Sequence, residues 1–214
     1  MAPRANPQVS SRKSPKQARS EDLVSAVLTA AIQVLRDEGA ARFTTARVAE
    51  RAGVSVGSLY QYFPNKAAIL FRLQSDEWQQ TSAMLRKILE DQTQAPTARL
   101  RTLVHAFLRS ECDEADVRRA LADAAPLYRD APEAAEARGS STRLFENFMA
   151  EALDQADAAT RELAADLVRT TLSQVCGSFS GSPRSDDQIA AYADALADML
   201  CAYLDDLERK CGHA

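Results

Sequence analysis

The chain has 214 residues, with 26 Lys and Arg against 30 Asp and Glu, and a formal net charge of −4. Hydrophobic residues make up 46% of it, which is enough for a buried core and excludes a disordered chain. No stretch of about 18 apolar residues is present, which excludes a membrane-spanning helix, and the first twenty residues lack the apolar core of a secretory leader. We therefore expect a cytoplasmic protein.

The composition favours helix throughout. Gly and Pro are few, at seven and eight residues, and Ala, Leu, Glu and Arg, which are good helix formers, are abundant. Aromatic residues amount to 6% and β-branched runs are rare, which disfavours a sandwich or a barrel. The sequence predicts an all-α protein.

The charge is unevenly distributed along the chain. Residues 1–66 carry ten Lys and Arg against five Asp and Glu, a net charge of +5, whereas residues 67–214 carry 16 against 25, a net charge of −9. Such an asymmetry indicates that the first part of the chain meets a polyanion. An acidic protein overall can thus still bind nucleic acid.

The sequence offers no metal site and no catalytic motif. The four cysteines are separated by 64, 25 and 10 positions, and the two histidines lie far apart, so no zinc-ligand spacing is present. No phosphate-binding glycine loop, dinucleotide fingerprint or nucleophile motif occurs. We predict no metal, no cofactor and no enzymatic activity, although Cys112 and Cys176 leave a redox sensor as a minor alternative.

The first expected elements alternate with clear helix-ending signals. Residues 1–20 are rich in Pro, Ser and basic residues and cannot bury enough apolar surface, which predicts a disordered basic arm. From Glu21 apolar residues recur at steps of three and four, which predicts an amphipathic helix that Gly39 ends. Thr44 and Thr45 can then cap a short helix.

A second short helix and a longer one follow. Gly53 breaks the first short helix, because glycine accepts the positive φ of a tight turn, and Ser55 can cap the next one. Pro64 stops this helix, and Asn65 caps a longer helix that runs toward Leu89.

Beyond Pro96 helical periodicity continues without an internal repeat. We expect the second of these helices to end near Pro132, and Gly139 to disturb the start of the third. The periodic segments are Leu100–Leu108, Val117–Leu127, Leu144–Leu153, Leu163–Phe179 and Ile189–Leu207.

A short helix, a glycine turn and a second short helix in a basic region form the arrangement of a helix-turn-helix. Ala49 is small enough for the helices to cross closely. Val56, Gly57 and Ser58 are short enough for the second helix to enter a major groove about 12 Å wide. An ordinary helical hairpin has the same spacing, so spacing alone leaves both interpretations open.

The string from Phe43 to Lys66, FTTARVAERAGVSVGSLYQYFPNK, resembles the DNA-binding segment of the TetR family of transcriptional repressors. The resemblance covers roughly residues 21–70. It implies a nine-helix protomer that works as a homodimer, with its last two helices paired with those of the partner. It also implies a helix-turn-helix domain at residues 21–66 and a helical effector-binding and dimerisation domain at residues 67–210.

The same resemblance assigns roles at the DNA end. Tyr62 and Lys66 are the expected phosphate contacts, and Val56 is placed to touch a thymine methyl. Leu59 is expected to be structural, as is Phe63. Matching positions predict DNA contacts at Thr45, Arg47, Ser55, Val56, Gly57, Ser58, Tyr60, Gln61, Tyr62 and Lys66. Arg47 has the alternative of a solvated surface charge.

Two further sets of residues are expected in the second domain. Large side chains on its central helices, with a few polar ones, are candidates for an apolar effector pocket, although most such residues are core. They are Trp78, His105, Phe107, Tyr128, Phe145, Phe148, Met149, Gln174 and Phe179. One-sided apolar stripes on the last two helices predict a dimer interface, with burial inside one protomer as the alternative. They contain Leu163, Leu167, Leu172, Val175, Ile189, Tyr192, Leu196, Met199 and Tyr203.

Together these expectations describe a ligand-responsive repressor. A homodimer would bind a palindromic operator in double-stranded DNA and leave it when a small hydrophobic or aromatic effector binds. The alternatives are a nucleoid or division-linked DNA-binding protein that needs no inducer, and a transcriptional activator.

Overall fold

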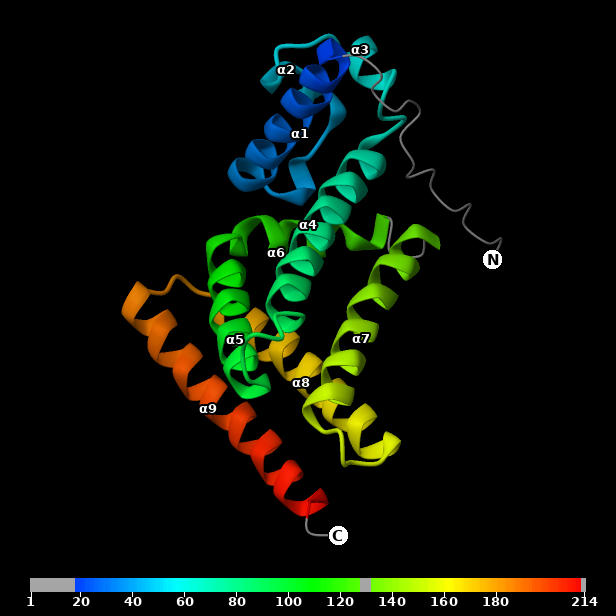
Figure 1. Cartoon of the computed structure of the whole chain (residues 1–214). Helices are drawn as coiled ribbons and strands as arrows, with labels where there is room; N and C mark the ends of the chain where they lie inside the picture. The colour runs from blue at the N-terminus through cyan, green and yellow to red at the C-terminus, as the bar shows by residue number, and fades with distance from the viewer. Residues whose placement is uncertain (1–17, 128–131, 213–214) are drawn as a thin grey trace, which may run out of the picture. The chain divides into compact units, whose positions relative to one another are not determined.

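The computed structural model describes residues 18–127 and 132–212, and within them the chain forms nine α-helices, two short 3-10 turns and no strand (Figure 1). None of the described helices is long and apolar enough to cross a membrane. The predicted all-α fold is confirmed. The helices are α1 (Ala18–Glu38), α2 (Thr45–Arg51), α3 (Val56–Tyr60), α4 (Lys66–Leu89), α5 (Pro96–Asp113), α6 (Ala115–Ala124), α7 (Pro132–Ala152), α8 (Ala158–Phe179) and α9 (Asp186–Cys211).

The chain divides into two compact units. The N-terminal unit contains residues 1–79 and 116–137, and the C-terminal unit contains residues 80–115 and 138–214. The N-terminal unit is thus larger than the predicted domain of residues 21–66, because Ala68, Leu70 and Leu121 are buried in its core. Sequence periodicity could not place these three residues, since it shows an apolar face without showing which core it joins.

Local signals explain the elements of the N-terminal unit. The apolar face of α1 buries Val27, Ala31 and Val34, as its steps of three and four predicted. Gly39 follows the helix with φ +73°, and Gly53 follows α2 with φ +67°, both in the left-handed region that favours glycine. The two expected helix endings are therefore confirmed.

The C-terminal unit has its own core. Leu103 and Leu108 of α5 are buried in this core with Val168 of α8 and Leu200 of α9. Its largest buried polar side chain is Arg99, whose guanidinium donates to the carbonyl of Leu89 at the end of α4 at 2.6 Å.

The helices after α5 differ in two places from the prediction. The α-helix that begins at Ala115 ends at Ala124 instead of near Pro132, and a 3-10 turn follows it. Pro126 lies in that turn, and proline lacks the N–H that would continue the ladder. Gly139 does not interrupt α7, because glycine lowers helix propensity by only about 1 kcal/mol.

Candidate nucleic-acid interface

Side-chain caps fix the start of both short helices. The hydroxyl of Thr44 accepts a hydrogen bond from the backbone N–H of Arg47 at 3.3 Å, and that of Ser55 accepts one from Ser58 N–H at 3.0 Å. Asn65 caps α4 in the same way, through the N–H of Ala68 at 2.9 Å. These caps satisfy donors that a short helix would otherwise leave unpaired, so the sequence signals acted as predicted.

Four apolar side chains lock α2 and α3 together. Val48, Ala49, Leu59 and Phe63 are all buried in the core of the N-terminal unit. Leu59 and Phe63 are therefore structural, as predicted. Because their side of α3 is buried, the opposite side is the one that a partner can reach.

The open side of α3 carries Val56, Gly57, Tyr60 and Gln61, all exposed. A Cβ added at Gly57 would meet nothing closer than 3.7 Å, and this glycine has no positive φ, so the fold itself does not require glycine there. The absent side chain leaves a place where another molecule can approach the backbone closely.

Two hydrogen bonds between hydroxyl groups lie beside this surface. The Oγ1 of Thr45 lies 3.1 Å from the hydroxyl of Tyr60, which joins α2 to α3, and Ser55 Oγ lies 2.8 Å from Ser58 Oγ. Tyr62 is half-buried against the core, and Lys66, the first residue of α4, is exposed. The pair of Thr45 and Tyr60 thus brings two of the expected DNA contacts together across α2 and α3.

Arg47 differs from this pattern because other groups of the protein hold its guanidinium. Its Nη1 pairs with Glu38 at the end of α1 and also donates to the carbonyl of Arg42 at 3.2 Å. Arg51 likewise pairs with Asp37 at 2.8 Å, and that carboxylate raises the pKa of the Arg51 guanidinium. Sequence analysis did not find Glu38, since a helix pattern does not show a pair nine residues apart.

The described candidate effector residues are divided between the two units. Phe145, Phe148 and Met149 are buried in the core of the C-terminal unit, and Phe107 is partly buried against it. Phe179 at the end of α8 stacks on Tyr192 of α9 with ring centroids 4.1 Å apart. Trp78 packs against the core of the N-terminal unit, and Tyr128 lies outside the described residues.

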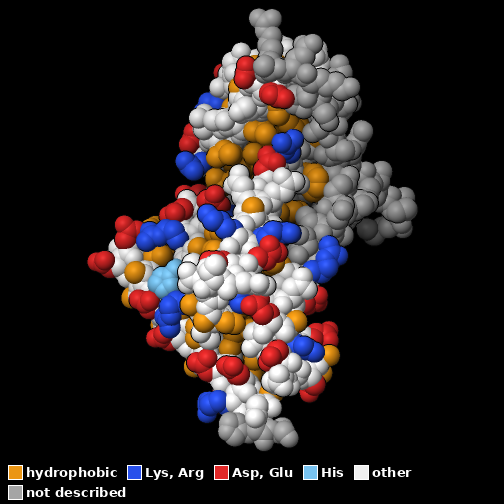
Figure 2. All heavy atoms as spheres, in the orientation of Figure 1, with side chains coloured by type: hydrophobic (Ala, Val, Ile, Leu, Met, Phe, Trp, Pro, Cys, Tyr) orange, Lys and Arg blue, Asp and Glu red, His pale blue; other side chains and the backbone are white. Residues whose placement is uncertain are grey.

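Two of the polar candidates, His105 and Gln174, lie at or near the surface of the C-terminal unit. Gln174 is exposed, because it lies about 200° around α8 from the buried Leu172. His105 of α5 pairs with Asp194 of α9 at 3.1 Å. Figure 2 shows acidic and basic side chains intermixed on the C-terminal unit.

His105 belongs to a row of pairs between α5 and α9. Arg101 pairs with Asp198, and Arg109 pairs with Asp186. The three residues on α5 are four positions apart, and their partners on α9 are four and eight positions apart. This spacing puts each set on one helix face, because side chains four positions apart lie on the same face. The row occupies a seam within the protomer.

The residues predicted for the dimer interface separate into two groups. Leu172, Ile189 and Leu196 are buried in the protomer's own core, so they offer no surface to a partner. This corrects the prediction for those three, because the stripes on α8 and α9 also contain the faces that pack inside one chain. Val175 and Tyr203 are partly buried against the same core.

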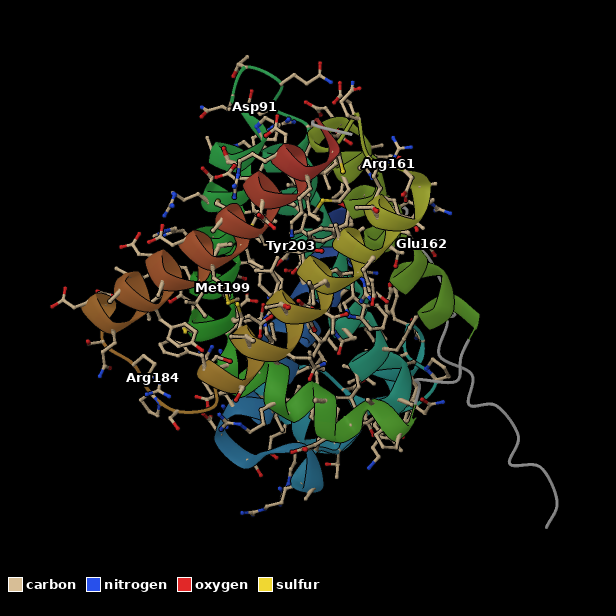
Figure 3. All side chains as sticks on the ribbon, turned by 90° about the horizontal axis from the view of Figure 1, so that it is seen from below. Asp91, Arg161, Glu162, Arg184, Met199 and Tyr203 are labelled. Atoms are coloured by element: carbon tan, nitrogen blue, oxygen red, sulfur yellow. The ribbon has the colours of Figure 1, made fainter. Side chains whose placement is uncertain are left out.

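The other four predicted interface residues remain open. Leu163, Leu167, Tyr192 and Met199 are large apolar side chains at exposed positions on α8 and α9. Figure 3 looks onto these two helices, with Arg161 and Glu162 labelled on α8 and Met199 on α9. Exposed leucines and a methionine on adjacent helices are typical of a surface that another protein covers. We refer to these four residues as the α8–α9 face.

Comparisons with known families match both parts of the chain. The family model described as "Bacterial regulatory proteins, tetR family" matches residues 27–73, which contain α2 and α3. The model described as "Tetracyclin repressor-like, C-terminal domain" matches residues 95–207.

Curated relatives and solved structures give further likenesses. The nucleoid occlusion factor SlmA of Vibrio campbellii is 35% identical over 83 residues, which are 38% of this chain and 42% of that protein. The chain thus matches less than half the length of this relative. The fatty acid degradation regulator FadR of Bacillus halodurans has a TM-score of 0.64 at 18% identity, covering 88% of this chain and 97% of FadR. A TetR/AcrR-family regulator of Thermobifida fusca has a TM-score of 0.66 at 17% identity, covering 84% and 97%. These two structures share the fold.

Proposed function

Because the chain belongs to the TetR family and is therefore a DNA-binding transcription regulator, we propose that it is a repressor that binds a palindromic operator as a homodimer and leaves it when a small effector binds. The observation that carries the proposal is the open side of α3. It presents Val56, Tyr60 and Gln61 around the bare backbone of Gly57. Exposed side chains beside a bare stretch of backbone, on a rigid and capped helix, suit contact with base edges in a major groove.

In this proposal, the residues that contact phosphates differ from those that contact base edges. Lys66 is a cation at the first turn of α4, where the helix dipole also favours an anion, so it suits a phosphate. The hydroxyls of Thr45, Tyr60 and Tyr62 add neutral donors for phosphate oxygens. Val56 and Gln61 are the candidates for base readout, the former through a thymine methyl and the latter through a base edge.

The α8–α9 face supplies the proposed dimer contact. A two-fold axis places the same apolar residues of both protomers against one another, as in a four-helix bundle. Such a dimer presents two copies of α3, which then read half-sites about 34 Å apart or a multiple of it. TetR-family regulators act as dimers, which supports this part of the proposal.

The proposed effector is a small hydrophobic or aromatic molecule taken up by the C-terminal unit. Phe107, Phe145, Phe148 and Met149 supply apolar surface there, and methionine adapts to varied shapes. The structurally similar FadR of Bacillus subtilis, at 16% identity, was solved in complex with stearoyl-CoA. The effector releases DNA only to the extent that it binds the free conformation more tightly than the DNA-bound one.

A second function has its own support. The curated relatives are nucleoid occlusion factors, so an inducer-independent DNA-binding role remains the alternative. A thermal-shift screen of fatty acids, acyl-CoA esters and aromatic compounds separates the two. A ligand that stabilises the protein and releases DNA supports the repressor, and stabilisation by none supports the alternative.

The DNA end is tested by selection and salt titration. A duplex selected from a random library is titrated against the wild type, Lys66→Ala and the control Lys87→Ala, an exposed lysine at the other end of α4. Each phosphate contact contributes about 0.9 to the slope of log K against log salt, so losing Lys66 from both protomers should flatten the slope by about 1.8. Equal slopes for both variants would reject the phosphate assignment, and no duplex binding by the wild type would reject the function.

A further inference from the structure

We propose that Glu38 competes with DNA phosphates for Arg47 and so limits the sequence-independent affinity of the protein for DNA. This inference rests on the proposed function, since it requires that α2 and α3 face a duplex. It assigns to an acidic residue outside the helix-turn-helix a role in setting how strongly the unit binds DNA of any sequence.

Two arginines share one oxygen of Glu38. Arg47 Nη1 pairs with Glu38 Oε2, and Arg42 Nε lies 3.8 Å from the same atom. The Arg47 guanidinium is further fixed by the carbonyl of Arg42 at 3.2 Å. The Glu38 side chain is only 22% exposed, so water screens its pair with Arg47 less than it screens a fully solvated pair.

Most cations of the N-terminal unit are held in similar pairs. Those whose pairs the structure describes are Arg42, Arg47, Arg51, Arg72, Arg118 and Arg119, paired with Glu38, Glu38, Asp37, Asp76, Glu77 and Asp116 in that order. Among the side chains described from residue 20 onward in this unit, Arg36 and Lys66 are exposed and outside these ion pairs. The number of cations in this unit therefore overstates the number that are available to phosphate.

The competition has a thermodynamic signature. When an unpaired lysine side chain of the protein contacts a phosphate, a condensed cation leaves the DNA, and this release makes binding depend on salt. While Arg47 stays on Glu38, it makes no phosphate contact and releases no condensed cation. Arg47 therefore adds little affinity and little salt dependence as long as Glu38 is present.

The test uses a random-sequence duplex and four forms of the full chain. Glu38→Gln removes the competitor without changing the shape of the side chain. Glu21→Gln removes one charge from an exposed position at the other end of α1 and controls for net charge. Arg47→Gln and the double variant complete a double-mutant cycle, and melting curves confirm that each form is folded.

The expected result is specific to one pair. Glu38→Gln should bind more tightly than Glu21→Gln and steepen the slope of log K against log salt by about 1.8 per dimer, so its advantage should shrink about 12-fold between about 50 and 200 mM salt. The effect should vanish with Arg47→Gln present. With Glu38 present, Arg47→Gln should change the slope of log K against log salt much less than Lys66→Ala does. This comparison tests the proposal even if Glu38→Gln fails to fold.

Each other outcome overturns a different statement. Equal affinities and slopes for Glu38→Gln and Glu21→Gln, or weaker binding by Glu38→Gln, would overturn the competition. A Glu38→Gln effect that persists in the Arg47→Gln background would overturn the assignment to Arg47. If the wild type binds no duplex, the proposed function itself fails.

Discussion

Replacing Leu163 with Ser is the sharpest test of the α8–α9 face. Leu163 is 65% exposed in the protomer, and surface substitutions away from special features change stability by no more than about 0.5 kcal/mol. If the face is covered by a second copy of the chain, the same substitution removes apolar area from the interface. A monomer would therefore hardly respond to it, whereas a dimer should weaken.

The size of the effect follows from the exposed fraction. Fully burying a leucine side chain is worth about 1.5–3 kcal/mol, so covering the exposed 65% of Leu163 contributes about 1–2 kcal/mol. A two-fold interface contains two copies, which raises this to about 2–4 kcal/mol per dimer. Each 1.4 kcal/mol is a factor of ten, so the dimer dissociation constant should rise about 30- to 700-fold.

Sedimentation equilibrium over a dilution series measures that constant for the wild type, Leu163→Ser and a matched control. Leu127→Ser serves as the control, because Leu127 is also exposed, at 37%, but lies in the N-terminal unit. Melting temperatures should depend on concentration for the wild type and the control, and fall further for Leu163→Ser at low concentration. An unchanged dissociation constant for Leu163→Ser, or a monomeric wild type, would refute the reasoning.

The remaining predictions concern the core of the C-terminal unit. Burial raises the pKa of Cys176 to about 12, from an ordinary value of 9.0. The unfolded chain therefore loses this proton near pH 9 while the folded chain keeps it, so the free energy of unfolding should fall between pH 9 and about 12. Urea titrations at several pH values measure the slope of this free energy against pH, and Cys176→Ala should make the slope less steep by up to about 1.4 kcal/mol per pH unit. An equal slope for the wild type and the variant would contradict this prediction. Glu151→Ala should lower the free energy of unfolding by about 3 kcal/mol, because the Arg99 side chain, which is only 1% exposed, loses its carboxylate partner. This value is the low end of the range of about 3–5 kcal/mol for breaking a buried pair, since the Glu151 side chain is 41% exposed. Glu146→Ala, an exposed position on the same helix, should cost no more than about 0.5 kcal/mol, and equal costs for the two would contradict the burial argument.

The sequence was most informative where a residue acts on its own backbone. Thr44, Ser55 and Asn65 cap the helices expected of them, and Gly39 and Gly53 take the positive φ that ends α1 and α2. Capping and left-handed turns depend on neighbours within a few positions, which a single sequence displays directly. The helix-turn-helix could therefore be predicted almost residue by residue.

Predictions failed where two faces of one helix are both apolar. Leu163 and Leu172 lie on the same helix and have the same chemistry, yet one is exposed and the other is buried in the protomer. Periodicity shows that a face is apolar and does not show whether the same chain or another one covers it. Contacts such as His105 with Asp194, 89 positions apart, depend on the path of the chain and leave no local signal.

The excess positive charge of the first 66 residues lies at their start. The excess of five positive charges comes from residues 1–19, which contain five Lys and Arg and no acid, whereas residues 20–66 contain five of each. Most arginines of that folded part are held by carboxylates, and of the residues expected to contact phosphate Lys66 is the cation outside these pairs. In the proposed complex, attraction to DNA of any sequence would therefore come mainly from residues 1–19, while α2 and α3 supply shape. Base readout of the proposed kind does not require an excess of positive charge on α2 and α3, because hydrogen bonds and apolar contacts to base edges need position more than charge.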